Sequence, residues 1–198
     1  MTQMAADPQP VIGYCVNADF SPSNAQILAA IIEKLHRHLP DAIWPMPTKT
    51  LHITLFDWVA PLVDYGRNKD ELFQQLRAEY TAAFKNILAG RQPIALHFNE
   101  IKITPGAVIA VATDDGSFTD IRHQFTSSIK LTEGTKPPPQ FIHSSLCRYM
   151  SQVDTYQVRD TLGGESISFD QIVTGFKLTK ELLAPMQKFE VLETFELS

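Results

Sequence analysis

The first half of the chain alternates between short apolar runs and longer stretches with helical spacing. Residues 11–16 form a β-branched and aromatic run, which predicts a buried strand. Ser21 and Pro22 then offer an N-cap and a proline at the first helical position. Apolar residues follow at the spacing of a core-facing helical stripe: Ile27, Leu28, Ile31, Ile32 and Leu35. After a proline-containing loop, residues 51–56 alternate between apolar and polar and predict a second strand.

The next segments complete this half, and the second half repeats their order. A helix is predicted over residues 72–88, with Gly90 placed to end it. Extended segments are predicted at 94–98 and 99–103. The second half then predicts a strand at 108–112, a helix after a turn at 114–117, a strand at 141–146, a shorter helix over 151–162, an extended segment at 167–178 and a last strand at 189–197.

The chain therefore contains two copies of a strand–helix–strand–helix–strand unit. Their last segments compare directly, NEIKIT (99–104) against TGFKLT (174–179). Two copies with an irregular period exclude a solenoid, and no linker is long enough to separate independent domains. We therefore predict an α+β fold with a pseudo-twofold axis, a single bilobal domain over residues 8–198, and a flexible N-terminus over 1–7.

Composition and charge exclude several classes of protein. The 198 residues carry 17 Lys and Arg against 22 Asp and Glu, a net charge of −5, which disfavours a long nucleic acid as partner. No apolar stretch approaches the ~20 residues of a membrane span, and the N-terminus lacks the order of a secretory signal. Cys15 and Cys147 are too few for a disulfide framework. A cytoplasmic protein without a membrane partner is expected.

Each copy carries one histidine followed two residues later by a hydroxyl. His52 and Thr54 share one face of their strand, as do His143 and Ser145, because side chains at i and i+2 point the same way. If the lobes face each other, two imidazoles and two hydroxyls meet in one cleft. One neutral imidazole can then accept a proton while the other, protonated, donates one, and the hydroxyls can hydrogen-bond to phosphoryl oxygens.

These two tetrapeptides, HITL at 52–55 and HSSL at 143–146, resemble the paired HxTx and HxSx motifs of the 2H phosphoesterase superfamily. That superfamily includes LigT-like RNA 2′–5′ ligases and 2′,3′-cyclic nucleotide phosphodiesterases. The resemblance implies antiparallel sheets facing a central cleft, with helices on the outside. It also implies a cyclic phosphodiesterase or related phosphoesterase without metal or other cofactor.

Residue by residue, the resemblance implies that His52 and His143 are the acid–base pair and that Thr54 and Ser145 bind phosphate. LigT-like members continue the second motif as HxTLxR, and HSSLCR places Arg148 at the last position. Strict alternation, however, puts Arg148 on the face opposite His143 unless the strand bulges. Ser144 also departs from the family, which has an apolar residue there.

Further candidates come from the residues around the motifs. Tyr14 and Phe56 could line the cleft and stack on a base, although aromatic residues in strands are more often part of the core. Cys147 shares the face of His143 by strict alternation, but no neighbouring residue indicates an activated thiolate, so a small buried residue is expected.

The expected substrate is a small nucleotide or a short RNA end that carries a cyclic phosphate or a 2′–5′ linkage. The alternative is a non-catalytic module that binds nucleotides or RNA ends on the same scaffold. A third interpretation treats both motifs as coincidental in a structural α+β protein. The sequence leaves the oligomeric state open, with a monomer as one outcome, and it does not say which histidine is the acid.

Overall fold

The computed structural model describes Thr2 and residues 9–198. The strands are β1 (Gln9–Asp19), β2 (Ile43–Pro45), β3 (His52–Val59), β4 (Ile94–Ile103), β5 (Ala107–Thr113), β6 (Ile142–Tyr149), β7 (Phe169–Val173), β8 (Gly175–Ala184) and β9 (Lys188–Glu196). The helices are α1 (Pro22–His38), α2 (Lys69–Leu88), α3 (Ser117–Ser128) and α4 (Thr155–Leu162), with a short 3-10 turn at Thr48–Thr50.

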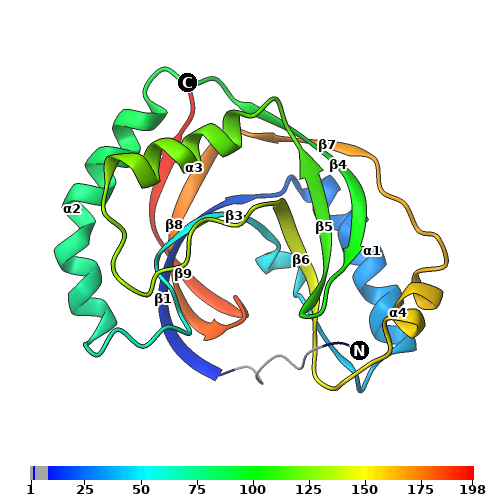
Figure 1. The fold of residues 1–198 in the computed structure, drawn as a ribbon. Coiled ribbons are helices and arrows are strands. Elements are labelled where there is room, and N and C mark those ends of the chain that lie inside the picture. Colours follow the sequence, from blue (N-terminus) through cyan, green and yellow to red (C-terminus); the bar gives the residue numbers. More distant parts are fainter. Residues whose placement is uncertain (1, 3–8) are drawn as a thin grey trace.

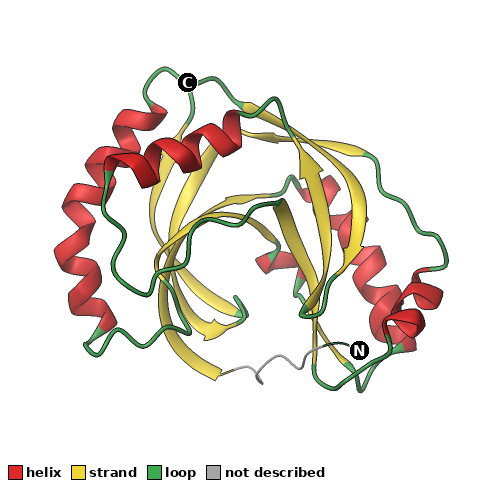
Figure 2. Cartoon of the chain, in the orientation of Figure 1, coloured by secondary structure: helices red, strands yellow, loops and turns green. Residues whose placement is uncertain are grey.

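These strands form two antiparallel sheets whose inner faces look toward each other (Figure 1). The first sheet has the order β3-β1-β8-β9 and the second has the order β2-β6-β5-β4-β7. Figure 2 shows α2 and α3 outside the first sheet, and α1 and α4 outside the second. The predicted α+β fold with facing antiparallel sheets and outer helices is confirmed.

The helix boundaries follow from local capping. The Ser21 hydroxyl accepts a hydrogen bond from the Asn24 amide at 3.2 Å, and Pro22 opens α1 as predicted. The predicted stripe of α1 is buried except for Ile27, which is 42% exposed. The shorter helix α4 begins four residues later than predicted, because Asp154 caps it by accepting from the Tyr156 amide.

The last strand of each strand–helix–strand–helix–strand unit pairs with the first strand of the other unit. The extended segments predicted at 94–98 and 99–103 are one strand, β4, which ends the first half and pairs with β5 of the second half. The equivalent strand of the second half, β8, pairs with β1 of the first. The repeated segments 99–104 and 174–179 belong to these two strands. Each lobe is therefore built from both halves of the chain.

An aromatic core lies between the first sheet and the helices α2 and α3. The Phe56 ring from β3 stacks on Phe125 from α3 with ring centroids 4.1 Å apart, and Trp58 packs edge to face against Tyr80 of α2. These side chains are at most 2% exposed. Burial of rings of this size contributes strongly to stability and fixes the position of β3 against its helices.

The prediction of a flexible segment over residues 1–7 falls, apart from Thr2, outside the described residues. Thr2 is buried, and its amide donates to the Val153 carbonyl at 3.0 Å. No helix in the described part of the chain is long and apolar enough to cross a membrane. The extent of the single domain, 8–198, stays a prediction.

Because β4 and β8 each complete the sheet of the other half, neither half should fold alone. We expect separate fragments of residues 1–104 and 105–198 to show no cooperative thermal unfolding by circular dichroism. Mixing the fragments should restore a cooperative transition, since Leu96 and Phe98 of β4 regain their buried contacts. Cooperative unfolding of the first fragment on its own would contradict this expectation.

Candidate active site

A pocket of about 520 Å³ opens between the two sheets and brings both motifs together. His52 and Thr54 reach it from β3, and His143 and Ser145 reach it from β6. The volume lies in the range of small-ligand sites. The four residues that the sequence analysis singled out from two distant segments thus share one cavity.

The two imidazoles are held in the same way. Nδ1 of His52 lies 2.8 Å from the Thr50 carbonyl oxygen, and Nδ1 of His143 lies 3.2 Å from the Phe141 carbonyl oxygen. A carbonyl oxygen can only accept, so Nδ1 carries the proton in both rings. In the neutral form, Nε2 is then the basic nitrogen of each histidine. Each contact runs to the residue two positions upstream, as the pseudo-twofold axis requires.

Each motif ends in a β-bulge at its leucine. In the register of β1 and β3, Asn17 faces Thr54 and Val16 faces Phe56, which leaves Leu55 without an opposite residue. In the register of β5 and β6, Ile109 faces Ser145 and Val108 faces Cys147, which leaves Leu146 as the extra residue. The alternation of side chains is therefore reset after each hydroxyl-bearing residue.

The bulges decide which later residues line the pocket. They turn Asp57 and Arg148, each three residues after its hydroxyl-bearing residue, into the cavity. The expectation from strict alternation that Arg148 lies opposite His143 is therefore wrong, and Arg148 lines the same pocket as His143. Cys147 is fully buried in the core, as expected, although strict alternation puts it on the His143 face, and burial raises the pKa of its thiol to about 12.

The two aromatic residues proposed for base stacking do not line this pocket. The bulge at Leu55 turns Phe56 away from the cavity and onto Phe125. Tyr14 is 2% exposed, its ring stacks on Phe73 with centroids 3.7 Å apart, and its hydroxyl donates to Asp70. Both rings lie in the core, the more common placement of aromatic residues in strands, and core neighbours cover the faces that base stacking would need.

The electrostatics of the pocket favour neutral histidines. Burial lowers the pKa of His52 and of His143 below the usual value, and the positive charge of Arg148 lowers both further. Nε of Arg148 is buried without a hydrogen-bond partner among the described residues. None of the ion pairs found in that part of the chain includes Arg148. A guanidinium in this state favours an anionic ligand.

Two carboxyl groups that the sequence analysis did not name also line the pocket. Burial raises the pKa of Asp57 to about 6 and that of Glu181 to about 7, and the nearby charge of Asp57 contributes to raising the pKa of Glu181. Glu181 comes from β8 and accepts a hydrogen bond from the Met186 amide at 2.5 Å. The bulge that exposes Asp57 to the cavity leaves no mark in the sequence. Glu181 could have been recognised only once β8 was known to cross into the first sheet.

The remaining wall of the pocket is mostly apolar, with Met46, Pro61, Leu62, Pro139 and Met186 among its residues. Within the described residues, no three His, Cys, Asp or Glu side chains are grouped as a metal site needs. The pocket thus has three regions. One holds two imidazoles, two hydroxyls and a guanidinium, the second is an acidic corner formed by Asp57 and Glu181, and the third is the apolar wall.

The fold is shared with solved structures of low sequence identity. TT0787 of Thermus thermophilus superposes with a TM-score of 0.65 at 19% identity, covering 93% of this chain and 97% of that one. Escherichia coli LigT in complex with 3′-AMP gives 0.63 at 20% identity, covering 97% and 99%. A crystal structure of a phosphoesterase gives 0.62 at 16% identity, covering 94% and 99%. No protein-family model and no curated protein matches the sequence.

These similarities confirm the fold that the resemblance to the 2H phosphoesterases implies. They extend over nearly the whole chain and over nearly the whole of each solved structure. At such low identity they establish the architecture, and the chemistry has to be argued from the pocket itself.

The Glu181 carboxyl predicts a pH-dependent stability. Its pKa is raised in the folded chain, so the stability that it contributes is present at low pH and is lost as the pH rises through about 7. Glu181→Gln keeps an acceptor for the Met186 amide but cannot ionise. Between pH 5 and pH 8, the wild type should lose about 2 kcal/mol more free energy of unfolding than the variant, measured by urea denaturation. Glu190→Gln on the exposed side of β9 is the control, and equal losses in all three proteins would contradict the prediction.

Ser144 predicts a stabilising substitution. Its side chain is 1% exposed on the core face of β6, and its hydroxyl has no hydrogen-bond partner among the described residues. Ser144→Ala removes this unsatisfied group and should raise the free energy of unfolding by about 1 kcal/mol. A destabilised variant in chemical denaturation would show that the hydroxyl is satisfied in solution.

Proposed function

We propose that this protein is a metal-independent phosphoesterase that acts on a 2′,3′-cyclic phosphate or a 2′–5′ linkage of a small nucleotide or RNA end. His52 and His143 are the acid–base pair, Thr54 and Ser145 bind the phosphoryl oxygens, and Arg148 offsets their charge. The observation that carries the proposal is the matched pair of histidines in one pocket, each with Nδ1–H on a backbone carbonyl and each beside a hydroxyl.

The arrangement supports hydrolysis by in-line displacement. One neutral imidazole accepts a proton at Nε2 from water as the water oxygen bonds to phosphorus. The bond from phosphorus to one ribose oxygen breaks, and that oxygen takes a proton from Nε2 of the other, protonated imidazole. The Thr54 and Ser145 hydroxyls donate to the non-bridging oxygens, where negative charge grows in the transition state.

Binding of an anionic substrate also favours protonation of one of the two histidines, which the acid of the pair needs. Without a ligand, the pKa of both histidines is lowered and both rings favour the neutral form near pH 7. A phosphodiester anion between them raises their pKa, because an adjacent negative charge stabilises the imidazolium. Substrate binding is thus coupled to the uptake of one proton, as acid–base catalysis by the pair requires.

The comparisons support a nucleotide as substrate. The E. coli LigT structures include complexes with 3′-AMP, ATP and NADP+. The apolar wall and the acidic corner of the present pocket offer surfaces for a sugar and a base beside the phosphate. Hydrolysis is proposed over ligation, because the pocket holds its own acid and base and needs only water.

The direct test replaces each histidine in turn. His52→Ala and His143→Ala should each lower kcat on 2′,3′-cyclic nucleotides by about 10³-fold or more, because a general acid or base is lost. Both variants should keep the far-ultraviolet circular dichroism of the wild type. His36→Ala, at an exposed position of α1, is the matched control and should leave kcat unchanged. The substrate panel contains the four 2′,3′-cyclic mononucleotides and a 2′–5′-linked dinucleotide.

The same assays separate the competing interpretations. Activity that persists in EDTA supports the proposal, whereas loss that is restored by a divalent metal favours a metal-dependent hydrolase. Nucleotide binding by calorimetry without turnover of any panel member favours a non-catalytic binding module. Full activity in both histidine variants would refute the assignment of the pair.

A further inference from the structure

Arg122 is a charged residue in the core-facing stripe of α3. It stands among Phe118, Ile121 and Phe125, the apolar positions from which that helix was predicted, and only 5% of it is exposed. Its guanidinium lies over the Phe118 ring, 4.8 Å from the ring centroid. A charged side chain at this helical spacing is rarely buried unless its polar groups are paired.

The guanidinium hydrogen-bonds to the backbone of both motif segments. Nη2 donates to the Thr54 carbonyl at 2.8 Å, and Nε donates to the Leu55 carbonyl at 2.9 Å. Nη1 makes a longer contact of 3.4 Å with the Phe141 carbonyl at the start of β6. One side chain thus joins the bulge of the first motif to Phe141, two residues before the second motif.

The bulge explains how one guanidinium bonds two successive carbonyls. In a regular strand, the carbonyls of neighbouring residues point to opposite edges, so a single donor group cannot meet both. The extra residue Leu55 breaks this alternation, so the carbonyls of Thr54 and Leu55 both face Arg122. The planar guanidinium of an arginine fits two such acceptors with separate nitrogens, whereas a lysine carries all its N–H donors on one nitrogen.

Arg122 also acts on the second histidine through a shared acceptor. The Phe141 carbonyl that it contacts is the oxygen that accepts Nδ1–H of His143. The charged groups around His143 are Arg148 on its own strand and Arg122 on α3, and His52 faces it from β3 across the pocket. The positive charge of Arg122 adds to the lowering of the His143 pKa.

No ion pair offsets the burial of this charge. None of the ion pairs in the described part of the chain includes Arg122, and burial lowers its pKa to about 10, with Asp114 acting in the opposite direction. A buried cation whose partners are all neutral carbonyls costs stability compared with an apolar residue of similar size. Its benefit therefore lies in the backbone geometry that it holds.

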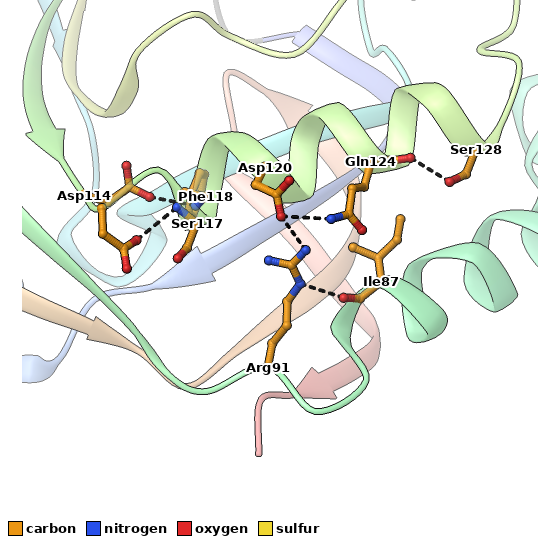
Figure 3. A network of polar contacts seen from close by, with 9 residues as sticks. Ile87, Arg91, Asp114, Ser117, Phe118, Asp120, Gln124 and Ser128 are labelled. Carbon is orange, nitrogen blue, oxygen red and sulfur yellow. Dashed lines mark hydrogen bonds and ion pairs between the residues drawn. The ribbon is translucent and has the colours of Figure 1, made fainter.

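The opposite face of α3 is anchored independently (Figure 3). Arg91 donates from Nε to the Ile87 carbonyl at 2.7 Å and from Nη2 to Asp120 at 2.6 Å, and Gln124 also donates to Asp120. At the helix start, Asp114 accepts from the Phe118 amide. These contacts anchor α3 beside the end of α2 in addition to the hydrogen bonds of Arg122.

We propose that Arg122 is a positioning residue that holds the His52–Thr54 and His143–Ser145 segments in register across the pocket by bonding the carbonyls of Thr54, Leu55 and Phe141. It touches neither substrate nor reacting atoms and acts through the backbone of β3 and β6. This inference rests on the proposed phosphoesterase function for its kinetic consequence, but its effect on the histidines can be measured without turnover.

Two substitutions separate the geometry from the charge. Arg122→Lys keeps the charge and loses the planar guanidinium, and Arg122→Gln loses both. In each variant, kcat on 2′,3′-cyclic nucleotides should fall about 10- to 100-fold per folded molecule with little change in KM, because supporting residues of a site have effects of this size. Arg91→Lys and Arg91→Gln remove the other arginine that holds α3 and should leave kcat and the histidine pKa values unchanged.

The second readout is the titration of the histidine Cε1–H signals by NMR, with and without inorganic phosphate. Arg122→Gln should raise the pKa of His143, because a positive charge beside it is removed. Arg122→Lys should leave that pKa near its wild-type value but shift the signals of both His52 and His143, since the backbone at both motifs moves.

The possible outcomes are distinct. Wild-type kcat, histidine signals and pKa values in both Arg122 variants would overturn the positioning role, even if unfolding shows them to be less stable. If Arg122→Gln does not fold, Arg122→Lys decides alone through kcat and the histidine signals. A wild type that turns over no panel member refutes the proposed function only, and the NMR titration then still tests the positioning role.

Discussion

One extra residue in each motif strand controls the arrangement of the pocket. Leu55 and Leu146 stand outside the pairing of their strands, and both are fully buried. Along each strand, a histidine and a hydroxyl face the cavity and the next two side chains are buried. Because of the bulge, the charged residue that follows them faces the cavity again. Because the fold is duplicated, the two strands show the same pattern. The result is one carboxyl, Asp57, and one guanidinium, Arg148, at equivalent positions of a pseudosymmetric site.

The sequence predicted the parts of this protein that depend on periodicity and missed those that depend on register. Helix α1 and the paired histidine strands follow from spacing and capping residues alone. Strict alternation gives the wrong faces for Phe56, Cys147 and Arg148, because a bulge changes the side of a strand without changing its composition. Glu181 reaches the pocket through the pairing of β8 with β1, a contact between opposite ends of the chain. Arg122 is visible in the sequence as a charge at a core position of a helix, but its hydrogen-bond partners are known only from the structure.

The pocket also reconciles the acidity of the chain with an anionic ligand. The net charge of −5 is spread over the whole protein, whereas the positive charge in the pocket is carried by one guanidinium, beside two imidazoles for which burial favours the uncharged form. Such a site attracts a compact anion at short range and offers no extended basic surface to a long polyanion. The acidic corner beside it adds a second constraint, because the part of a ligand that reaches Asp57 and Glu181 meets two carboxyls whose raised pKa values, about 6 and about 7, let them accept or donate hydrogen bonds near neutral pH.

The pairing of β4 with β5 and of β8 with β1 bears on how such a chain can arise by duplication. An ancestral polypeptide of half this length, before the two halves diverged, would end in a strand with no partner in its own sheet, and it could pair that strand only with a second copy of itself. Two copies would form a closed twofold dimer in which each subunit supplies one histidine and one hydroxyl to the shared pocket. Joining the copies into one chain makes assembly of the pocket independent of concentration. It also frees the two halves to diverge, so that an aspartate in one corresponds to an arginine in the other.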